Sequence, residues 1–256
     1  MPPESSLPDE VRSYALVAAA DLFEELFASA RFEDLGKGRL GTTVVKCDET
    51  GGIPLVRTTT RYRTPAQHFQ PVHERLARQI QERAELSVGF DNALVECYTN
   101  AYRTMGSHSD QALDLADGSF IAVFSCYRHP GVSQPRKLVF ESKEPGADGF
   151  EIPLAHHGVV VFSVATNRLL RHRIVLDAAG PVPDNQWLGV TFRTSKTFVR
   201  FRDGDAYLPD GARLLLADEE QRAEFYRLRR RENQETDFAY PLLTYTVSGS
   251  DLVPPV

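Results

Sequence analysis

The sequence predicts an α+β protein in which helices support a β-rich core of the jelly-roll (cupin-like) type. Helix-type apolar spacing is confined to the first 90 residues and to a charged segment near the C-terminus. Between them lie eight short segments rich in β-branched and aromatic residues, separated by Gly, Pro, Asp and Asn. Helices do not alternate with these strands, so a sandwich or barrel is favoured over a doubly wound α/β fold.

The N-terminal part is expected to hold two helices behind a loose leader, residues 1–10. Over residues 11–30 the apolar side chains recur at helical spacing, and Asp9 and Glu10 are suited to cap and charge the start of that helix. A second helix is expected over residues 71–86. It begins with proline, which the first helical turn tolerates because its missing N–H would have no partner there.

Strands account for most of the remaining chain. A short strand is expected at 42–47, and residues 56–69 form a β-type run that Pro65 interrupts. The eight core strands are predicted at 93–98, 119–127, 136–142, 150–154, 158–163, 172–176, 187–193 and 196–201. A charged helix over about 217–234 follows, and its arginine-rich segment 228–231 is expected to face solvent.

Length and composition indicate one globular domain over residues 11–256, with its jelly-roll core at about 90–201. The chain has 256 residues, 42% of them hydrophobic, and a net charge of -6, which argues against a protein that mainly binds phosphate backbones. Three widely spaced cysteines, Cys47, Cys97 and Cys126, fit free thiols in a reducing compartment. Because no apolar run reaches the roughly 18 residues of a membrane span, we expect a cytoplasmic protein without a membrane partner.

The most informative feature is the motif Gly106-Ser107-His108-Ser109-Asp110, followed further along the chain by His172. A His-x-Asp pair and one distant histidine are the three ligands of a facial iron site, which leaves three positions open on the metal. In an extended strand, residues two apart point to the same face. Taken alone, each of these side chains is better explained as an ordinary solvated or partly exposed polar residue.

The neighbouring residues resemble the AlkB-like family of Fe(II)/2-oxoglutarate-dependent dioxygenases. In residues 94–126 an apolar strand carries Tyr98 ten residues before His108, and the His-x-Asp motif, a linker and a second apolar strand follow. Residues 156–174 resemble the run that leads to the family's distal histidine, and Val-Thr-Phe-Arg at 190–193 resembles its ending. The resemblance covers roughly residues 53–196.

This resemblance implies a double-stranded β-helix fold with Fe(II) held by His108, Asp110 and His172. It assigns 2-oxoglutarate to Arg193, since a guanidinium can bind a carboxylate at two points, and a hydroxyl contact to Tyr98. O2 would be the other co-substrate. No catalytic residue beyond the iron ligands is implied.

Three positions depart from the family's pattern. Glu96 stands where the family has Asn, Trp187 replaces a second arginine, and Gly189 stands where Asn or Ser is usual. Some contacts to 2-oxoglutarate are therefore altered. The sequence does not choose among the candidates for a replacement cation, which are Arg168, Arg171 and Arg200.

Four residues are candidates for substrate contact. Arg61 and Tyr62 lie where related enzymes carry a substrate lid, and Tyr127 and Arg128 follow an inner strand that could end at the substrate mouth. Each could equally be an ordinary loop or strand-end residue.

The leading hypothesis is an Fe(II)/2-oxoglutarate-dependent dioxygenase that oxidises a C–H bond of a small molecule, in specialised metabolism, and releases succinate and CO2. An AlkB-like oxidative demethylase of nucleic acid or protein is the first alternative, and nucleic acid is the less favoured partner because the chain is acidic. The second alternative is a non-catalytic metal-binding module.

Overall fold

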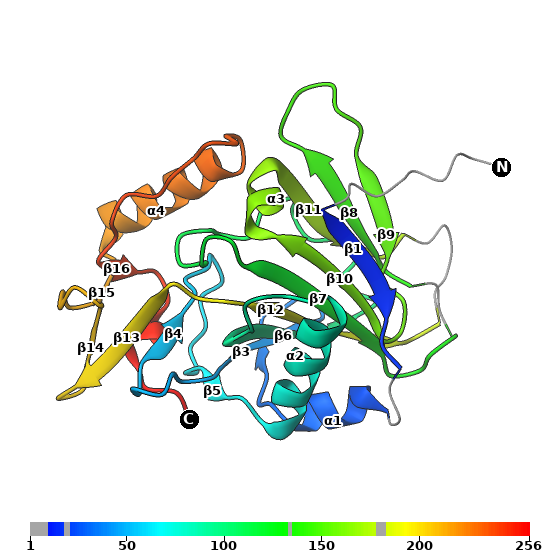
Figure 1. Cartoon of the computed structure of the whole chain (residues 1–256), viewed down its shortest axis with the longest axis horizontal. Helices are drawn as coiled ribbons and strands as arrows, with labels where there is room; N and C mark the ends of the chain where they lie inside the picture. Colours follow the sequence, from blue (N-terminus) through cyan, green and yellow to red (C-terminus); the bar gives the residue numbers. More distant parts are fainter. Residues whose placement is uncertain (1–9, 18–20, 133–134, 178–182) are drawn as a thin grey trace.

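The computed structural model describes residues 10–17, 21–132, 135–177 and 183–256 (Figure 1). They form mostly antiparallel β-sheets with few helices, an arrangement consistent with a β-sandwich or jelly roll. The loose leader expected at the N-terminus lies outside the described residues, except for Glu10.

The largest sheet has eight strands in the order β1-β10-β7-β12-β6-β3-β2, with β5 paired to β3. Each neighbouring pair is antiparallel except β3 with β5. Its strands are β1 (Val11–Ala15), β2 (Glu33–Asp34), β3 (Arg39–Val45), β5 (Gln67–His68), β6 (Asn92–Thr99), β7 (Phe120–Tyr127), β10 (Gly158–Ser163) and β12 (Gln186–Arg193).

Three smaller sheets complete the β-structure of the described residues. One has the order β11-β8-β9, one the order β14-β13-β4, and the third pairs β15 with β16. Their strands are β4 (Ile53–Leu55), β8 (Lys137–Ser142), β9 (Phe150–Pro153), β11 (Leu170–Val175), β13 (Thr197–Arg202), β14 (Asp205–Tyr207), β15 (Leu215–Leu216) and β16 (Tyr245–Thr246). All eight predicted core strands are confirmed, with ends shifted by at most two residues.

The helices are few and short. They are α1 (Leu22–Ala28), α2 (Pro71–Arg83), α3 (Val164–Leu169), α4 (Glu219–Glu232) and the 3₁₀ helix η1 (Gly249–Leu252). The predictions of α2 and α4 are confirmed. The helix α3 was not predicted, and it occupies the short connection expected between β10 and β11.

The predicted helix over residues 11–30 is wrong in its first part. Val11–Ala15 form the edge strand β1, paired along its length with β10, because that sheet edge offers a full set of backbone partners. The helix begins only at Leu22, where the side chain of Asp21 accepts a hydrogen bond from the N–H of Phe23.

The predicted β-type run over residues 56–69 is also largely wrong, since only Gln67–His68 are in a strand. In the first part of the segment, side chains bind the backbone in place of a neighbouring strand. The N–H of Arg57 donates to Asp114, that of Tyr62 to Ser248, and that of Arg63 to Glu33. Most of the segment is therefore an ordered loop.

Both faces of the large sheet are covered. On one face α1 and α2 pack through residues such as Phe23, Leu26 and Ile80 (Figure 1). On the other, Ile121 of β7 packs in one apolar cluster with Phe140 of the smaller β11-β8-β9 sheet. The space between these two sheets holds the site described below.

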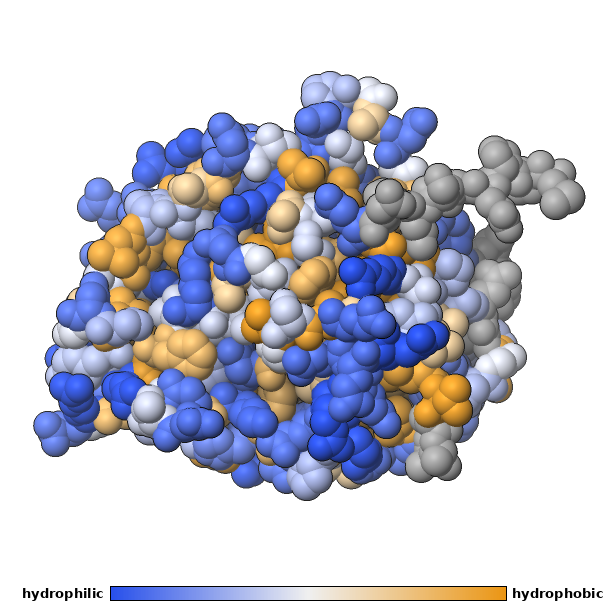
Figure 2. Space-filling model, viewed as in Figure 1, coloured by the Kyte–Doolittle hydropathy of each residue, from blue (hydrophilic) through white to orange (hydrophobic). Residues whose placement is uncertain are grey.

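The spread of hydrophobic residues on the surface and the state of the cysteines agree with what the composition predicts. On the face shown in Figure 2, hydrophobic residues form small separate patches among hydrophilic ones. Within the described residues, no helix is long and apolar enough to cross a membrane. Cys47, Cys97 and Cys126 are free thiols, as predicted.

His73 caps the helix α2 and makes the stability of the folded protein sensitive to acid. Its Nδ1 accepts from the N–H of Gln70 and its Nε2 faces the hydroxyl of Ser29, so the ring is neutral. Burial lowers the pKa of His73 to about 4, below the roughly 6.5 of an unfolded chain. The folded protein therefore loses stability as pH falls from about 6.5 to 4, because only the unfolded chain binds this proton.

The variant His73→Gln carries an amide that can replace the cap but does not titrate. We expect its free energy of unfolding to depend less steeply on pH in that range, by up to about 1.4 kcal/mol per pH unit. Urea unfolding at several pH values between 4 and 7 measures this slope. Parallel curves for the variant and the wild type would contradict the assignment.

Candidate metal centre

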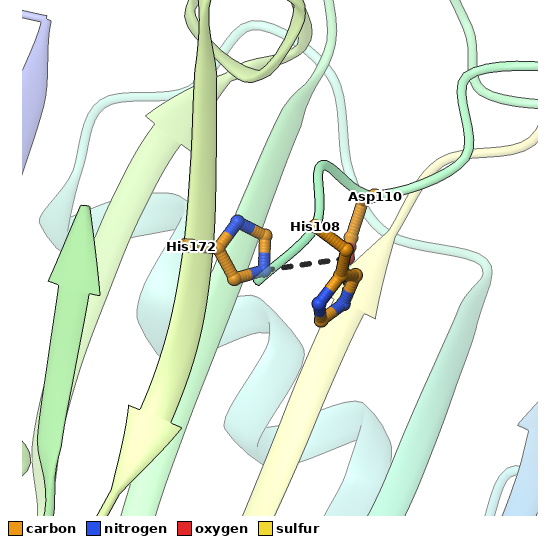
Figure 3. Close-up of side chains that lie close together, drawn as sticks. All are labelled: His108, Asp110 and His172. Atoms are coloured by element: carbon orange, nitrogen blue, oxygen red, sulfur yellow. Dashed lines mark ion pairs between the residues drawn. The ribbon is translucent and has the colours of Figure 1, made fainter. Parts of the chain in front are cut away.

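Three predicted ligands meet in the space between the two facing sheets. His172 lies on β11, and His108 and Asp110 lie on the segment that joins β6 to β7 (Figure 3). The backbones of His108 and His172 exchange two hydrogen bonds, N to O, of 2.9 and 2.6 Å. This bridge fixes the two histidines side by side although 64 positions separate them in the sequence.

The ligand atoms converge. Asp110 Oδ1 lies 3.5 Å from His172 Nε2 and 3.8 Å from His108 Nε2, and one ligand atom from each residue lies within 4.8 Å of the others. The Nδ1 of His108 is 2.9 Å from the carbonyl oxygen of Gly106. This contact assigns the proton to Nδ1 and leaves the lone pair of Nε2 facing the other two ligands.

The ionisation states suit a metal. Desolvation is the main cause that lowers the pKa of His108 to about 3, and His172 beside it lowers it further. Burial alone would raise the pKa of Asp110, but Arg193 and His172 outweigh it and hold this pKa well below its usual value. At neutral pH His108 is a neutral imidazole and Asp110 an anion, the states that a divalent transition metal requires.

Arg193 lies at the triad. Its Nε donates to Asp110 Oδ2 at 2.7 Å in a buried ion pair, so the carboxylate keeps Oδ1 for the histidine side. The Nη atoms of Arg193 have no hydrogen-bond partner among the described residues. Tyr98, in contrast, is fully buried, and its hydroxyl donates to Glu96 Oε2 at 2.8 Å.

Two neighbouring spaces, which share part of their lining, adjoin the triad. The inner cavity, of about 90 Å³, contains the three predicted ligands, Arg193 and Gln111 in its wall. A second space of about 320 Å³, which we call the vestibule, also has His108 in its wall. Both spaces are lined by Arg39, Thr59, Thr60, Met105, His108 and Arg229.

The structure does not bring the four predicted substrate residues to these spaces. Arg61 lies against Tyr226 on α4. Tyr62 is buried beside Gly41. Neither lines the inner cavity or the vestibule.

Tyr127 and Arg128 also point elsewhere. The Tyr127 hydroxyl donates to the carbonyl of Leu154 inside the core. Arg128 stacks over Phe23 and pairs with Glu24 of α1, on the opposite face of the large sheet. Arg128 directly follows β7, and strand alternation places it on the face opposite Tyr127.

Sequence reasoning missed Arg39, which the structure places in the wall of both spaces. Its guanidinium binds Glu96 Oε1 through Nε at 2.8 Å and through Nη2 at 2.5 Å. The cations considered from the sequence do not line either space: Arg168 pairs with Asp117, Arg171 lies near Glu141, and Arg200 binds Thr50. The sequence signal for Arg39 is its position as a charged residue at the start of the β-type segment RLGTTVV, residues 39–45.

Trp187 and Gly189 are coupled. A Cβ at Gly189 would lie 2.1 Å from the indole atom Cη2, so the ring of Trp187 lies directly over the glycine. The indole N–H donates to the hydroxyl of Ser125, and the ring packs against Tyr98 with centroids 4.8 Å apart. The indole therefore fills the space that a longer side chain at 189 would need.

Side chains from two helices hold the ligand loop 108–112. Asn167 of α3 accepts from the N–H of Asp110 and donates to its carbonyl, both at 2.7 Å. From α4, Arg229 donates to the carbonyl of Ser109 and Glu232 accepts from the N–H of Ala112. The predicted solvated face at 228–231 is therefore wrong for Arg229, which is buried.

Comparison with known proteins gave structural matches only. No family model matches the sequence, and no curated protein matches it. One similar solved structure is a prolyl-4-hydroxylase from Pseudomonas putida, with a TM-score of 0.42 and 12% identity, covering 72% of this chain and 92% of that one. Another is OsALKBH1, with a TM-score of 0.42 and 14% identity, covering 65% of this chain and 85% of that one.

Asn167→Ala tests the hold on Asp110. It leaves the N–H and carbonyl of Asp110 without partners, so we expect affinity for Fe(II) to fall about 10- to 100-fold, as for other losses of a residue that orients a ligand. Anaerobic calorimetric titration measures it.

The control for this variant is Gln67→Ala. Gln67 binds the N–H and carbonyl of Arg31 in the same way, away from the triad. Equal losses of metal affinity in the two variants would mean that Asn167 acts only through general stability.

Gly189→Ala tests the packing of Trp187. The added methyl must displace the indole, so we expect a loss of about 1–3 kcal/mol in stability and a shifted emission maximum. Trp187 is the only tryptophan, so fluorescence reports on it alone. Gly249→Ala, where an added Cβ meets nothing within 4 Å, is the control. Unchanged emission from Gly189→Ala would contradict the coupling.

Proposed function

We propose that this protein is an Fe(II)/2-oxoglutarate-dependent dioxygenase with a double-stranded β-helix core. Its reaction would oxidise a C–H bond of a small molecule and release succinate and CO2. The observation that carries the proposal is the convergence of His108, Asp110 and His172 on one point, with Arg193 beside them. Two imidazoles and a carboxylate on one face are the ligand set of non-haem iron oxygenases.

The charges support this assignment. Arg193 already balances the one carboxylate of the triad. A divalent metal would add two positive charges to a buried space, and 2-oxoglutarate, a dianion, would neutralise them. Burial makes such neutralisation important because uncompensated charge is costly inside a protein.

The chain's residues have separate roles in this proposal. His108, Asp110 and His172 would hold the metal, which with O2 and 2-oxoglutarate supplies the oxidising chemistry. The Nη atoms of Arg193, which have no hydrogen-bond partner within the described residues, would bind a carboxylate of 2-oxoglutarate. Tyr98 would act indirectly, because its hydroxyl holds Glu96 and does not face the inner cavity.

The space around the triad favours a small substrate. The inner cavity lies between the two sheets, and Val123, Leu138 and Ile174 line its wall. Apolar walls exclude water from the reacting centre. The net charge of -6 weighs against the nucleic-acid demethylase alternative, and a non-catalytic metal-binding module would not produce succinate.

Anaerobic titration tests the proposal. We expect Fe(II) followed by 2-oxoglutarate to give a visible metal-to-ligand charge-transfer band, which disappears in His108→Ala and weakens in Arg193→Ala. Succinate release in air then confirms turnover. Stoichiometric iron binding without the band would exclude 2-oxoglutarate as the co-substrate and favour the binding-module alternative.

A further inference from the structure

The hydrogen bonds around the site leave a surplus of donors. Both oxygens of Glu96 are occupied, Oε1 by Arg39 and Oε2 by Tyr98. Both oxygens of Glu232 are occupied as well, Oε1 by the N–H of Ala112 and Oε2 by Arg229. These carboxylates therefore have little capacity left for a cationic ligand.

The donors, in contrast, are not used up. Arg39 uses Nε and Nη2 for Glu96, and its Nη1 has no hydrogen-bond partner in the part of the chain that the structure describes. Gln111 is only 5% exposed, yet neither atom of its amide has a partner within the described residues. A buried polar group without a partner is costly. Nη1 of Arg39 and Nε2 of Gln111 both donate, so a ligand with acceptor atoms is their natural complement, and Oε1 of Gln111 can accept from a donor group of the same ligand.

Arg39 is the cation placed to meet a ligand in the vestibule. It lines that space and the inner cavity, its side chain is 22% exposed, and Glu96 fixes one edge of its guanidinium. Of the two spaces, Arg193 lines the inner cavity and not the vestibule, and Arg229 has both Nη atoms engaged. Fixing one edge orients the other, and a planar edge suits a carboxylate.

The rest of the vestibule suits a small polar molecule. The ring of Tyr102 and the side chain of Met105 offer apolar surface, whereas Thr59 and Thr60 offer hydroxyls. No aspartate or glutamate lines this space in the described part of the chain. Its volume of about 320 Å³ falls at the lower end of ordinary small-ligand sites.

We propose that the organic substrate is a small carboxylic acid whose carboxylate binds Arg39 in the vestibule, facing the metal at His108. This inference rests on the proposed function, because the vestibule is the substrate site only if the triad holds the reactive metal. It adds the substrate class and names Arg39 as the residue that selects it.

The test uses Mn(II)-loaded full-length protein, without oxygen and with 2-oxoglutarate filling the inner cavity. The probes are small aliphatic, hydroxy and amino acids and the primary amide of each acid, followed by NMR. Mn(II) broadens the proton signals of a ligand that binds beside it. We expect the acids to be broadened and to bind at least about tenfold more tightly than their amides, which corresponds to about 1.4 kcal/mol.

The matched variants isolate Arg39. Arg39→Gln combined with Glu96→Gln removes the ion pair without leaving an unpaired buried carboxylate, and we expect it to lose the preference for acids. Its affinity for 2-oxoglutarate should stay within about twofold. The control pair is Arg75→Gln with Glu25→Gln, an exposed ion pair between α1 and α2.

Each outcome decides between the inferences. If acids and amides bind equally, if inorganic phosphate displaces the acids at lower concentration than they bind, or if the Arg39 variant loses 2-oxoglutarate instead, the carboxylate subsite is overturned. If Mn(II) and 2-oxoglutarate bind but no acid does, this inference fails alone. If Mn(II) binding does not depend on His108, the proposed function fails and this inference with it.

Discussion

The buried ion pair between Asp110 and Arg193 is the constraint on which the site depends. Both side chains are almost fully buried, and their contact is 2.7 Å. Burial raises the pKa of a carboxylate in this position because it disfavours the charged form. Arg193 keeps Asp110 ionised, and by taking Oδ2 it leaves Oδ1 toward the two histidines. The last residue of β12 thus sets both the charge and the orientation of the predicted ligand.

The position of Asp110 also depends on the C-terminal part of the chain. The ligand loop 108–112 is not a strand and cannot rely on a ladder of backbone bonds, so α3 and α4 supply side-chain partners instead. Glu232 occupies a central place, since it binds the loop at Ala112, pairs with Arg229 and accepts from Tyr240. Lys143, which directly follows β8, donates to the carbonyl of Glu232 at the end of α4. The helix is therefore part of the site's framework and not a peripheral addition.

The sequence predicted the strands and the three candidate ligands because both leave local signals. Alternating or continuous apolar residues mark β6 to β13, and a His-x-Asp motif is readable wherever it lies. The errors arose where tertiary partners decide. Val11–Ala15 became a strand because β10 had a free edge, and the segment before β5 stayed irregular because side chains bound the backbone of residues such as Arg57 and Tyr62. Arg39 was missed for the same reason: its place in the cavity wall follows from the pairing of β3 with β6, which the sequence does not display.

The departures from the AlkB-like pattern become intelligible as linked changes. The indole of Trp187 requires a glycine at 189, because any larger residue there would overlap the ring. The register of β12 places Gly189 opposite Glu96, so the same small residue lies beside that carboxylate. Glu96 in turn fixes Arg39 and holds the hydroxyl of Tyr98, which packs on Trp187. The cavity wall thus contains a cation, Arg39, on β3. It lies at the end where the resemblance predicts an arginine on β12. These substitutions thus form one connected group of contacts.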